Sequence, residues 1–180
     1  MGLYESFGSL EHKFQQLGRE ADTGVVVTDG TRVEGYASLF GKRDQGGDVV
    51  QAGAYAKSLA GLKAAGRSVK MLWQHDPSAP IGVWDEVRED ATGLYVKGRI
   101  LTEVERGREA AALLAAGAID GLSIGYRTLR AERDGKGQRH LVELELWEVS
   151  LVTFPMLPEA RVSAKADDFA DTWRSMAQIF

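Results

Sequence analysis

Two long strand-like segments joined by a short polar turn constrain this fold more than any other feature of the sequence. The second segment, residues 139–153, is rich in Leu and Val with polar residues between them, and Pro155 ends it. The turn Gly-Lys-Gly at residues 135–137 separates it from a first segment that begins at Gly121. Strand-like segments on either side of a glycine turn are typical of a hairpin, so the chain is predicted to contain a long antiparallel pair of strands.

Further strands and two helices are predicted ahead of this hairpin. β-Branched and alternating residues indicate strands at residues 25–28, 31–40, 68–75, 81–88 and 94–100. Apolar residues at helical spacing indicate one helix that begins near Tyr55 and ends near Gly66. Thr102 and Glu105 have the spacing of a capping box, which predicts that a second helix begins there and ends near Gly117.

The chain is predicted to consist of a lead-in, one folded domain and a tail. Residues 1–22 are polar and weakly amphipathic, with apolar residues at the spacing of a short helix over residues 10–17. Residues 23–165 show no repeat, low-complexity tract or clear boundary, and we expect a single domain there. Residues 166–180 are acidic at first and then apolar, a pattern that suits a short helix docking on this chain or on a partner.

The composition argues against several classes of function. The 180 residues include 22 basic and 26 acidic ones, a net charge of -4, whereas nucleic-acid binders usually carry a basic excess. There is no cysteine, which rules out disulfides, thiolate catalysis and cysteine-ligated zinc and fits a cytosolic setting. The three histidines, His12, His75 and His140, lack the spacing of a zinc motif. No apolar run approaches the roughly 20 residues of a membrane span. We therefore expect no metal, no nucleic acid and no membrane.

Ser123 stands on an unusual strip in the first arm of the hairpin. In a strand it shares one face with Gly121 and Gly125, while the residues between them are apolar and can pack. A hydroxyl without side chains on either side leaves room for another backbone to approach. Such a serine is a nucleophile only if a base and an orienting group activate it, and otherwise the stretch is simply a weak strand. A strand-like pattern rather than a helix follows it, which argues against the nucleophile elbow of α/β-hydrolases.

Two titratable residues continue strand faces that are otherwise apolar. His75 continues the apolar face of the strand over residues 68–75, which Asp76-Pro77 is predicted to end. Glu148 lies in line with apolar residues of the second hairpin arm, where an unpaired carboxylate is costly to bury. Each alone is more often a satisfied core residue than a catalyst. With Ser123 they form a set in which a histidine takes the serine proton and a carboxylate fixes the histidine tautomer.

Five short motifs, in one order, resemble those of a known protein family. They are Glu34-Gly35-Tyr36-Ala37-Ser38-Leu39-Phe40, Gly47-Asp48-Val49-Val50 with Gly53-Ala54-Tyr55, Leu72-Trp73-Gln74-His75-Asp76, Gly121-Leu122-Ser123-Ile124-Gly125-Tyr126 and Glu148-Val149-Ser150-Leu151-Val152-Thr153-Phe154-Pro155. Over about residues 31–163 the chain is similar to the prohead maturation proteases of tailed phages. A prophage or gene-transfer-agent copy would look the same.

The resemblance implies a mixed α+β serine protease, a small and mostly antiparallel β-barrel flanked by helices and akin to the herpesvirus assemblins. By position, Ser123 would be the nucleophile, His75 the general base and Glu148 the third member. His140 is the rival for the third place, because the assemblins use a second histidine there. Arg127 shares the face of Ser123 further along the strand, and it is interpreted either as a substrate-binding residue or as a surface arginine.

The resemblance also implies a place of action and a partner. Such proteases work without a cofactor inside the immature capsid, in the cytoplasm of the host cell. They cleave the scaffold or the scaffolding part of the major capsid protein, and often themselves, and a homo-oligomer is compatible with this role. The rival from another functional class is a non-catalytic assembly factor that binds the scaffold through the same barrel.

Overall fold

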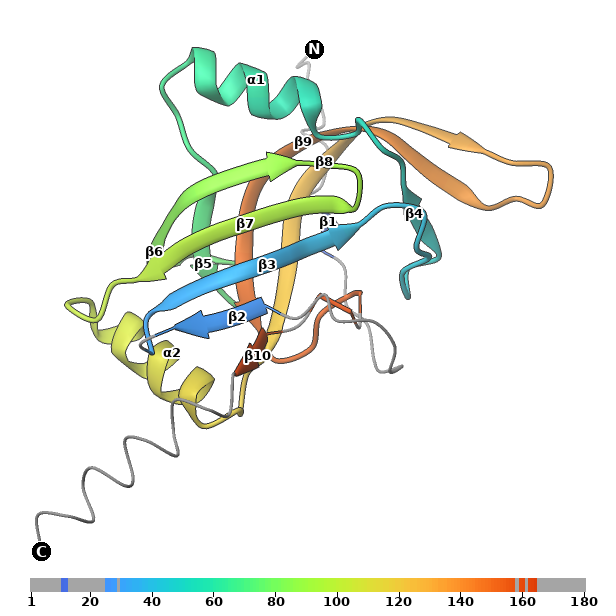
Figure 1. Ribbon diagram of the computed structural model, residues 1–180. Coiled ribbons are helices and arrows are strands. Elements are labelled where there is room, and N and C mark those ends of the chain that lie inside the picture. Colours follow the sequence, from blue (N-terminus) through green and yellow to red (C-terminus); the bar gives the residue numbers. More distant parts are fainter. Residues whose placement is uncertain (1–10, 13–24, 29, 158, 161, 165–180) are drawn as a thin grey trace, which may run out of the picture.

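One curled sheet dominates the structure, a computed structural model that describes residues 11–12, 25–28, 30–157, 159–160 and 162–164 (Figure 1). The helices are α1 (Ala56–Ala64) and α2 (Glu105–Ala115). The strands are β1 (Glu11–His12), β2 (Val25–Thr28), β3 (Arg32–Leu39), β4 (Asp48–Val50), β5 (Lys70–Trp73), β6 (Asp76–Glu89), β7 (Gly93–Ile100), β8 (Gly121–Arg133), β9 (Arg139–Val152) and β10 (Val162–Ala164).

The sheet forms a half-barrel rather than the closed barrel that the resemblance implies. Its order is β1-β8-β9-β5-β6-β7-β3-β2-β10, with β4 paired to β9, so β1 and β10 stand at the two ends of the described strands. The pairs β5–β9, β4–β9 and β10–β2 are parallel and the others are antiparallel. The predicted mixed, mostly antiparallel fold is therefore confirmed, whereas closure of the barrel is not.

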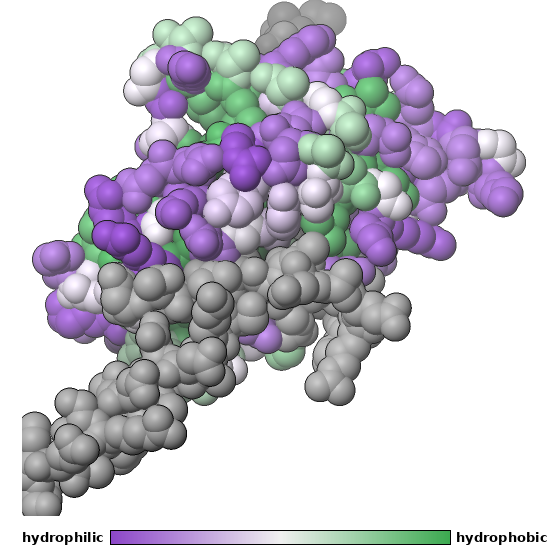
Figure 2. Space-filling model, viewed as in Figure 1, coloured by the Kyte–Doolittle hydropathy of each residue, from purple (hydrophilic) through white to green (hydrophobic). Residues whose placement is uncertain are grey.

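The helices and the sheet share one apolar core. Ala110 and Leu114 of α2 are buried in it, while Leu59 and Leu62 of α1 pack against it from the surface. Hydrophilic side chains cover much of the face shown in Figure 2, over β6 and β7, so the apolar residues of these strands turn inward. No helix among the described residues is both long and apolar enough to cross a membrane.

The predicted hairpin is present as β8 and β9. The two strands pair from Gly121 opposite Val152 to Arg133 opposite Arg139. Every residue of β8 from Gly121 to Tyr126 is buried, and the last five residues of β9 are buried as well, whereas β8 is exposed from Leu129 to Arg133. One end of the hairpin thus belongs to the core and the other projects from it (Figure 1).

The strand predicted over residues 68–75 ends earlier than expected. β5 stops at Trp73, Gln74 and His75 form a two-residue turn, and Asp76 opens β6 opposite Trp73. Gln74 has φ 52° and His75 has φ 63°. Positive φ at both central residues is the geometry of the tight turns that join antiparallel strands. The Asp76-Pro77 pair therefore begins a strand, which is compatible with proline because the pairing of β5 with β6 is irregular there.

The predicted capping box of the second helix is absent. The residue before α2 is Val104, which is extended and makes no side-chain capping bond. A turn precedes the helix instead, in which the Val104 N–H donates to Leu101 O at 3.1 Å. Gly107 allows the first turn of α2 to pack against Leu101, the residue after β7, because a Cβ at Gly107 would overlap the Leu101 carbonyl. Gly117, with φ 67°, ends the helix as predicted.

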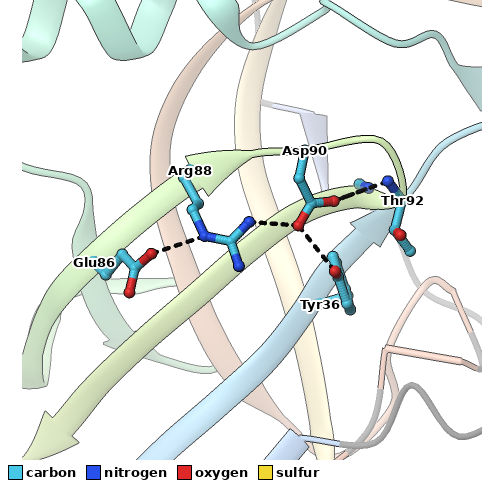
Figure 3. A network of polar contacts seen from close by, with 6 residues as sticks. Tyr36, Glu86, Arg88, Asp90 and Thr92 are labelled. Carbon is cyan, nitrogen blue, oxygen red and sulfur yellow. Dashed lines mark hydrogen bonds and ion pairs between the residues drawn. The ribbon is translucent and has the colours of Figure 1, made fainter.

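The turn between β6 and β7 is closed by the carboxylate of Asp90 (Figure 3). It accepts hydrogen bonds from the Thr92 N–H at 2.8 Å, the Tyr36 hydroxyl at 2.9 Å and the Arg88 guanidinium at 2.5 Å. Desolvation acts to raise the pKa of Asp90, but these bonds outweigh it and lower the pKa to about 2. The turn is thus held by groups that favour the ionised aspartate.

Two predictions for the ends of the chain lie largely outside the described residues. Of the helix predicted within residues 1–22, only Glu11 and His12 are described, and they form β1 against Tyr126 and Gly125 instead. The helix predicted within residues 166–180 is not described. The division into a lead-in, one domain and a tail stays a prediction.

Candidate active site

Ser123 lies on the buried part of β8, directly opposite Ser150 of β9. The residue is 2% exposed. Other groups of this chain occupy the space next to the glycines on either side of it. A Cβ at Gly125 would overlap the Glu148 carboxylate, and one at Gly121 would lie 2.7 Å from Pro155 Cδ. The strip without side chains therefore admits neighbouring groups of this chain, among them the Val152 carbonyl next to Gly121.

His75 connects the other two predicted residues. Its Nε2 lies 2.8 Å from Ser123 Oγ, and its Nδ1 lies 2.5 Å from Glu148 Oε1. The side chains of His75 and Glu148 are only 5% and 6% exposed. Three elements supply the three groups: β8, the turn between β5 and β6, and β9. Residues far apart in the sequence thus form one continuous hydrogen-bonded chain.

Strand alternation placed Glu148 correctly but explains only part of the position of His75. Glu148 is buried on the face that also holds the buried Leu144 and Leu146, as alternation along the strand predicts. His75 was predicted to continue the face of a strand, yet it lies beyond the end of β5 in a left-handed turn. The turn, rather than the strand, points its imidazole at Ser123.

Ser150 is a member of the cluster that sequence reasoning did not single out. Its hydroxyl donates to Glu148 Oε2 at 2.6 Å and accepts the backbone N–H of His75 at 3.1 Å. Ser150 is fully buried. The signal that could have identified it is its position two residues after Glu148, on the same face of a strand.

Hydrogen bonds to the end of β9 hold the turn that carries His75. The backbone N–H of Gln74 donates to Leu151 O at 3.0 Å. The amide side chain of Gln74 donates to Thr153 Oγ1 at 2.8 Å and accepts the Thr153 N–H at 3.3 Å. A left-handed backbone at a residue other than glycine costs on the order of 1–3 kcal/mol and persists only where surrounding contacts impose it.

His140, the rival for the third position, lies elsewhere. Its Nδ1 is 2.8 Å from Gln51 Nε2, and its Nε2 is 3.5 Å from Asp134 Oδ2. It stands ten residues before Ser150 on β9, which is about 33 Å along a strand at about 3.3 Å per residue. The third group in contact with His75 is therefore Glu148.

Arg127 also lies outside the cluster. Its guanidinium forms an ion pair with Glu145 at 2.7 Å, and the two side chains are 42% and 38% exposed. It pairs across the hairpin on the part of β8 that projects from the core. The contacts fit the interpretation as a surface arginine.

A small cavity opens beside Ser123. Its volume is about 20 Å³, which is enough for one water molecule. It is lined by residues of β3 and β8, among them Ser38 and Ile124, and by Met156 from the segment after β9. β3 has a bulge between Tyr36 and Ser38 at this place, a feature often found next to active sites. The described residues contain no group of three or more His, Asp or Glu that could hold a metal ion.

The geometry supports nucleophilic chemistry at Ser123. A carboxylate can only accept, so Nδ1 of His75 must carry a proton to bond with Glu148. In the neutral ring the lone pair is then on Nε2, which faces the Ser123 hydroxyl. A histidine in this tautomer can take the serine proton as the hydroxyl attacks.

Comparison with known proteins places this chain among the prohead proteases of tailed phages. The chain belongs to the caudovirus prohead serine protease family, whose family model matches residues 17–175. It is 31% identical to the prohead protease of Enterobacteria phage HK97 over 177 residues, which are 95% of this chain and 72% of that protein. The predicted resemblance is confirmed, and the family supports a role as a capsid maturation protease.

Two further matches concern the fold and a longer relative. The structure of the bacteriophage T4 capsid assembly protease has a TM-score of 0.57 at 15% identity, with 82% of this chain and 99% of that chain covered, which shows a shared fold. The capsid polyprotein of Pseudomonas phage PAJU2 is 29% identical over 103 residues, 53% of this chain and 15% of that protein. The likeness to the assemblins stays a prediction.

Proposed function

We propose that this chain is a serine endopeptidase in which Ser123 is the nucleophile, His75 the general base and Glu148 the residue that orients His75. The observation that carries this proposal is the unbroken chain of hydrogen bonds from Glu148 through His75 to Ser123, at 2.5 Å and 2.8 Å. Packing alone does not require a histidine and a carboxylate beside a buried serine. The same three groups in contact are the arrangement that activates a hydroxyl.

The reaction follows from the direction of these hydrogen bonds. Ser123 Oγ attacks the carbonyl carbon of the scissile peptide bond while its proton passes to Nε2 of His75. The resulting imidazolium is stabilised by Glu148, and it then donates the proton to the leaving amine. Water, deprotonated by the same nitrogen, releases the acyl group from Ser123. The cavity next to Ser123 is the place where we expect the carbonyl oxygen to be stabilised by backbone amides.

The substrate that fits this family is a capsid component. We propose that the chain cleaves the scaffold or the scaffolding segment of the major capsid protein, and itself, inside the prohead in the host cytoplasm. The family description and the name of the HK97 relative support a protease that acts in the prohead. The similar segment in a protein named a capsid polyprotein supports a capsid protein as the substrate.

Labelling with a fluorophosphonate tests the nucleophile. Ser123 Oγ would bond to phosphorus, fluoride would leave, and His75 would take the hydroxyl proton. We expect wild-type protein to be labelled and Ser123→Ala to lose labelling entirely. Ser58→Ala is the matched control, because Ser58 is a hydrogen-bonded serine that lies away from the cluster, on α1, where it accepts the Leu146 N–H at 2.9 Å. Labelling that persists in Ser123→Ala would contradict the assignment.

Co-expression with the neighbouring capsid gene tests the substrate. We expect wild-type chain to yield a shortened capsid protein, detected by mass spectrometry, and Ser123→Ala to leave it at full length. This experiment also covers an enzyme that becomes active only inside a shell. An unshortened capsid protein in correctly assembled shells, with no labelling of wild type, would favour the non-catalytic assembly factor.

A further inference from the structure

Ser150 contacts two of the groups that the proposed reaction depends on, the Glu148 carboxylate and the backbone of His75. Its hydroxyl oxygen is 2.6 Å from Glu148 Oε2 and 3.1 Å from the backbone nitrogen of His75. Because the N–H can only donate and the carboxylate can only accept, the single hydroxyl proton of Ser150 must point at Glu148. The direction of both bonds is therefore fixed.

The bond to Oε2 determines how the carboxylate meets the imidazole. With Oε2 held by Ser150, Oε1 is the oxygen that faces His75 Nδ1, at 2.5 Å. A carboxylate held at one oxygen cannot rotate away without leaving a buried hydroxyl or imidazole N–H unpaired, which is unfavourable. Ser150 thus holds the acid in the rotamer that selects the reactive tautomer of His75.

The bond to the His75 N–H acts on the turn rather than on the side chain. His75 has φ 63°, a conformation that a residue other than glycine keeps only under external contacts. Its backbone N–H is tied to β9 by Ser150 and that of Gln74 is tied to β9 by Leu151. Removing the Ser150 hydroxyl would remove the hydrogen bond to the His75 N–H and, at the same time, the hydrogen bond that holds Glu148 Oε2.

We propose that Ser150 is a positioning residue and the fourth member of this site. Its single hydroxyl holds both the Glu148 carboxylate and the backbone of His75 in place. This inference rests on the proposed function. It states that the site is a four-residue unit in which β9 supplies both the acid and the group that orients it. Displacement of a base by about 1 Å can cost on the order of a hundredfold in rate, which sets the scale of the expected effect.

The rate of fluorophosphonate labelling measures this role. In Ser150→Ala we expect the limiting rate of labelling to fall about 10- to 100-fold while the half-saturating probe concentration stays within about twofold, since Ser150 is fully buried. Ser58→Ala, which removes a comparable hydroxyl from a bond to a backbone N–H, should keep the wild-type rate. A Ser150→Ala rate within about twofold of wild type would overturn the proposal.

Proton NMR of the full chain gives a readout that needs no proteolysis. In a Ser123→Ala background we expect a downfield Nδ1–H resonance from the bond between His75 and Glu148, and its loss or marked shift when Ser150→Ala is added. An unchanged resonance would overturn the positioning role even if the chain proved inactive. Failure of wild type to label, in contrast, would count only against the proposed function. If Ser150→Ala does not fold, Ser150→Cys, which keeps the shape with a weak donor, carries the same two measurements.

Discussion

The two turns at the ends of β6 are built in opposite ways. The turn at Asp90 is closed mostly by its own residues, because the N–H groups of Thr92 and Gly93 donate to its carboxylate. The backbone N–H groups of Gln74 and His75 and the Gln74 side chain bond to the end of β9, more than seventy positions away along the chain, and the imidazole also contacts Ser123 of β8. One turn is specified locally, and the other is imposed from outside.

This difference matches what the turns do. In the described part of the chain, Gln74 and His75 are the two residues other than glycine with positive φ. A turn of this type normally favours Asn-Gly, which would be unstrained but would carry no imidazole. The structure therefore keeps a strained backbone where a histidine has to face Ser123, and a relaxed, self-closing turn where only a chain reversal is needed.

The largest effect should come from disrupting the hydrogen bond between His75 and Glu148. In Glu148→Gln the amide still fits, but it can present a donor to Nδ1 and so favour the unreactive histidine tautomer. We expect the labelling rate to fall about 10⁴-fold, with little change in thermal stability. Glu145→Gln, whose carboxylate pairs with Arg127 near the surface, is the control and should label normally. A loss of less than about tenfold would mean that Glu148 does not orient the base.

Substitutions of Gln74 should have a smaller effect, and comparing two of them distinguishes backbone strain from the loss of hydrogen bonds in the same turn. Gln74→Ala loses the bonds to Thr153 and keeps the left-handed strain, whereas Gln74→Gly loses the bonds and relieves the strain. We expect both variants to label about tenfold more slowly, with Gln74→Gly more stable than Gln74→Ala by about 1 kcal/mol in urea unfolding. Equal stability of the two would show that the turn is not strained.

The smallest effect on activity should come from the other turn. Asp90→Asn should lower the free energy of unfolding by about 1–2 kcal/mol and leave labelling unchanged, because Asp90 does not contact the serine cluster. The pKa of Asp90 is lowered to about 2 in the folded protein, so its contribution to stability is full above pH 4 and is lost as pH falls toward 2. Thermal melts of both proteins from pH 7 to 2 should therefore converge. A gap that stays constant over this range would contradict the ionic role.

The sequence predicted the parts of the site that depend on strand alternation. Glu148 and Ser123 lie on strands that were identified from their pattern, and the pairing of β8 with β9 brings the two strands together. It could not predict that a turn carries His75, because no Asn-Gly signal marks residues 74 and 75. The capping box predicted from Thr102 is absent, because a turn in which the Val104 N–H donates to Leu101 O precedes α2 instead.

The sequence by itself determined which face of the second hairpin arm is apolar and therefore that the Glu148 carboxylate would be buried, because successive side chains along a strand point to opposite faces. Only the tertiary structure decided the direction of the imidazole and the partner of the second carboxylate oxygen. Both depend on contacts of the Gln74–His75 turn and of Ser150 with groups that no local pattern brings near, and those contacts offset a backbone conformation that the turn residues disfavour on their own.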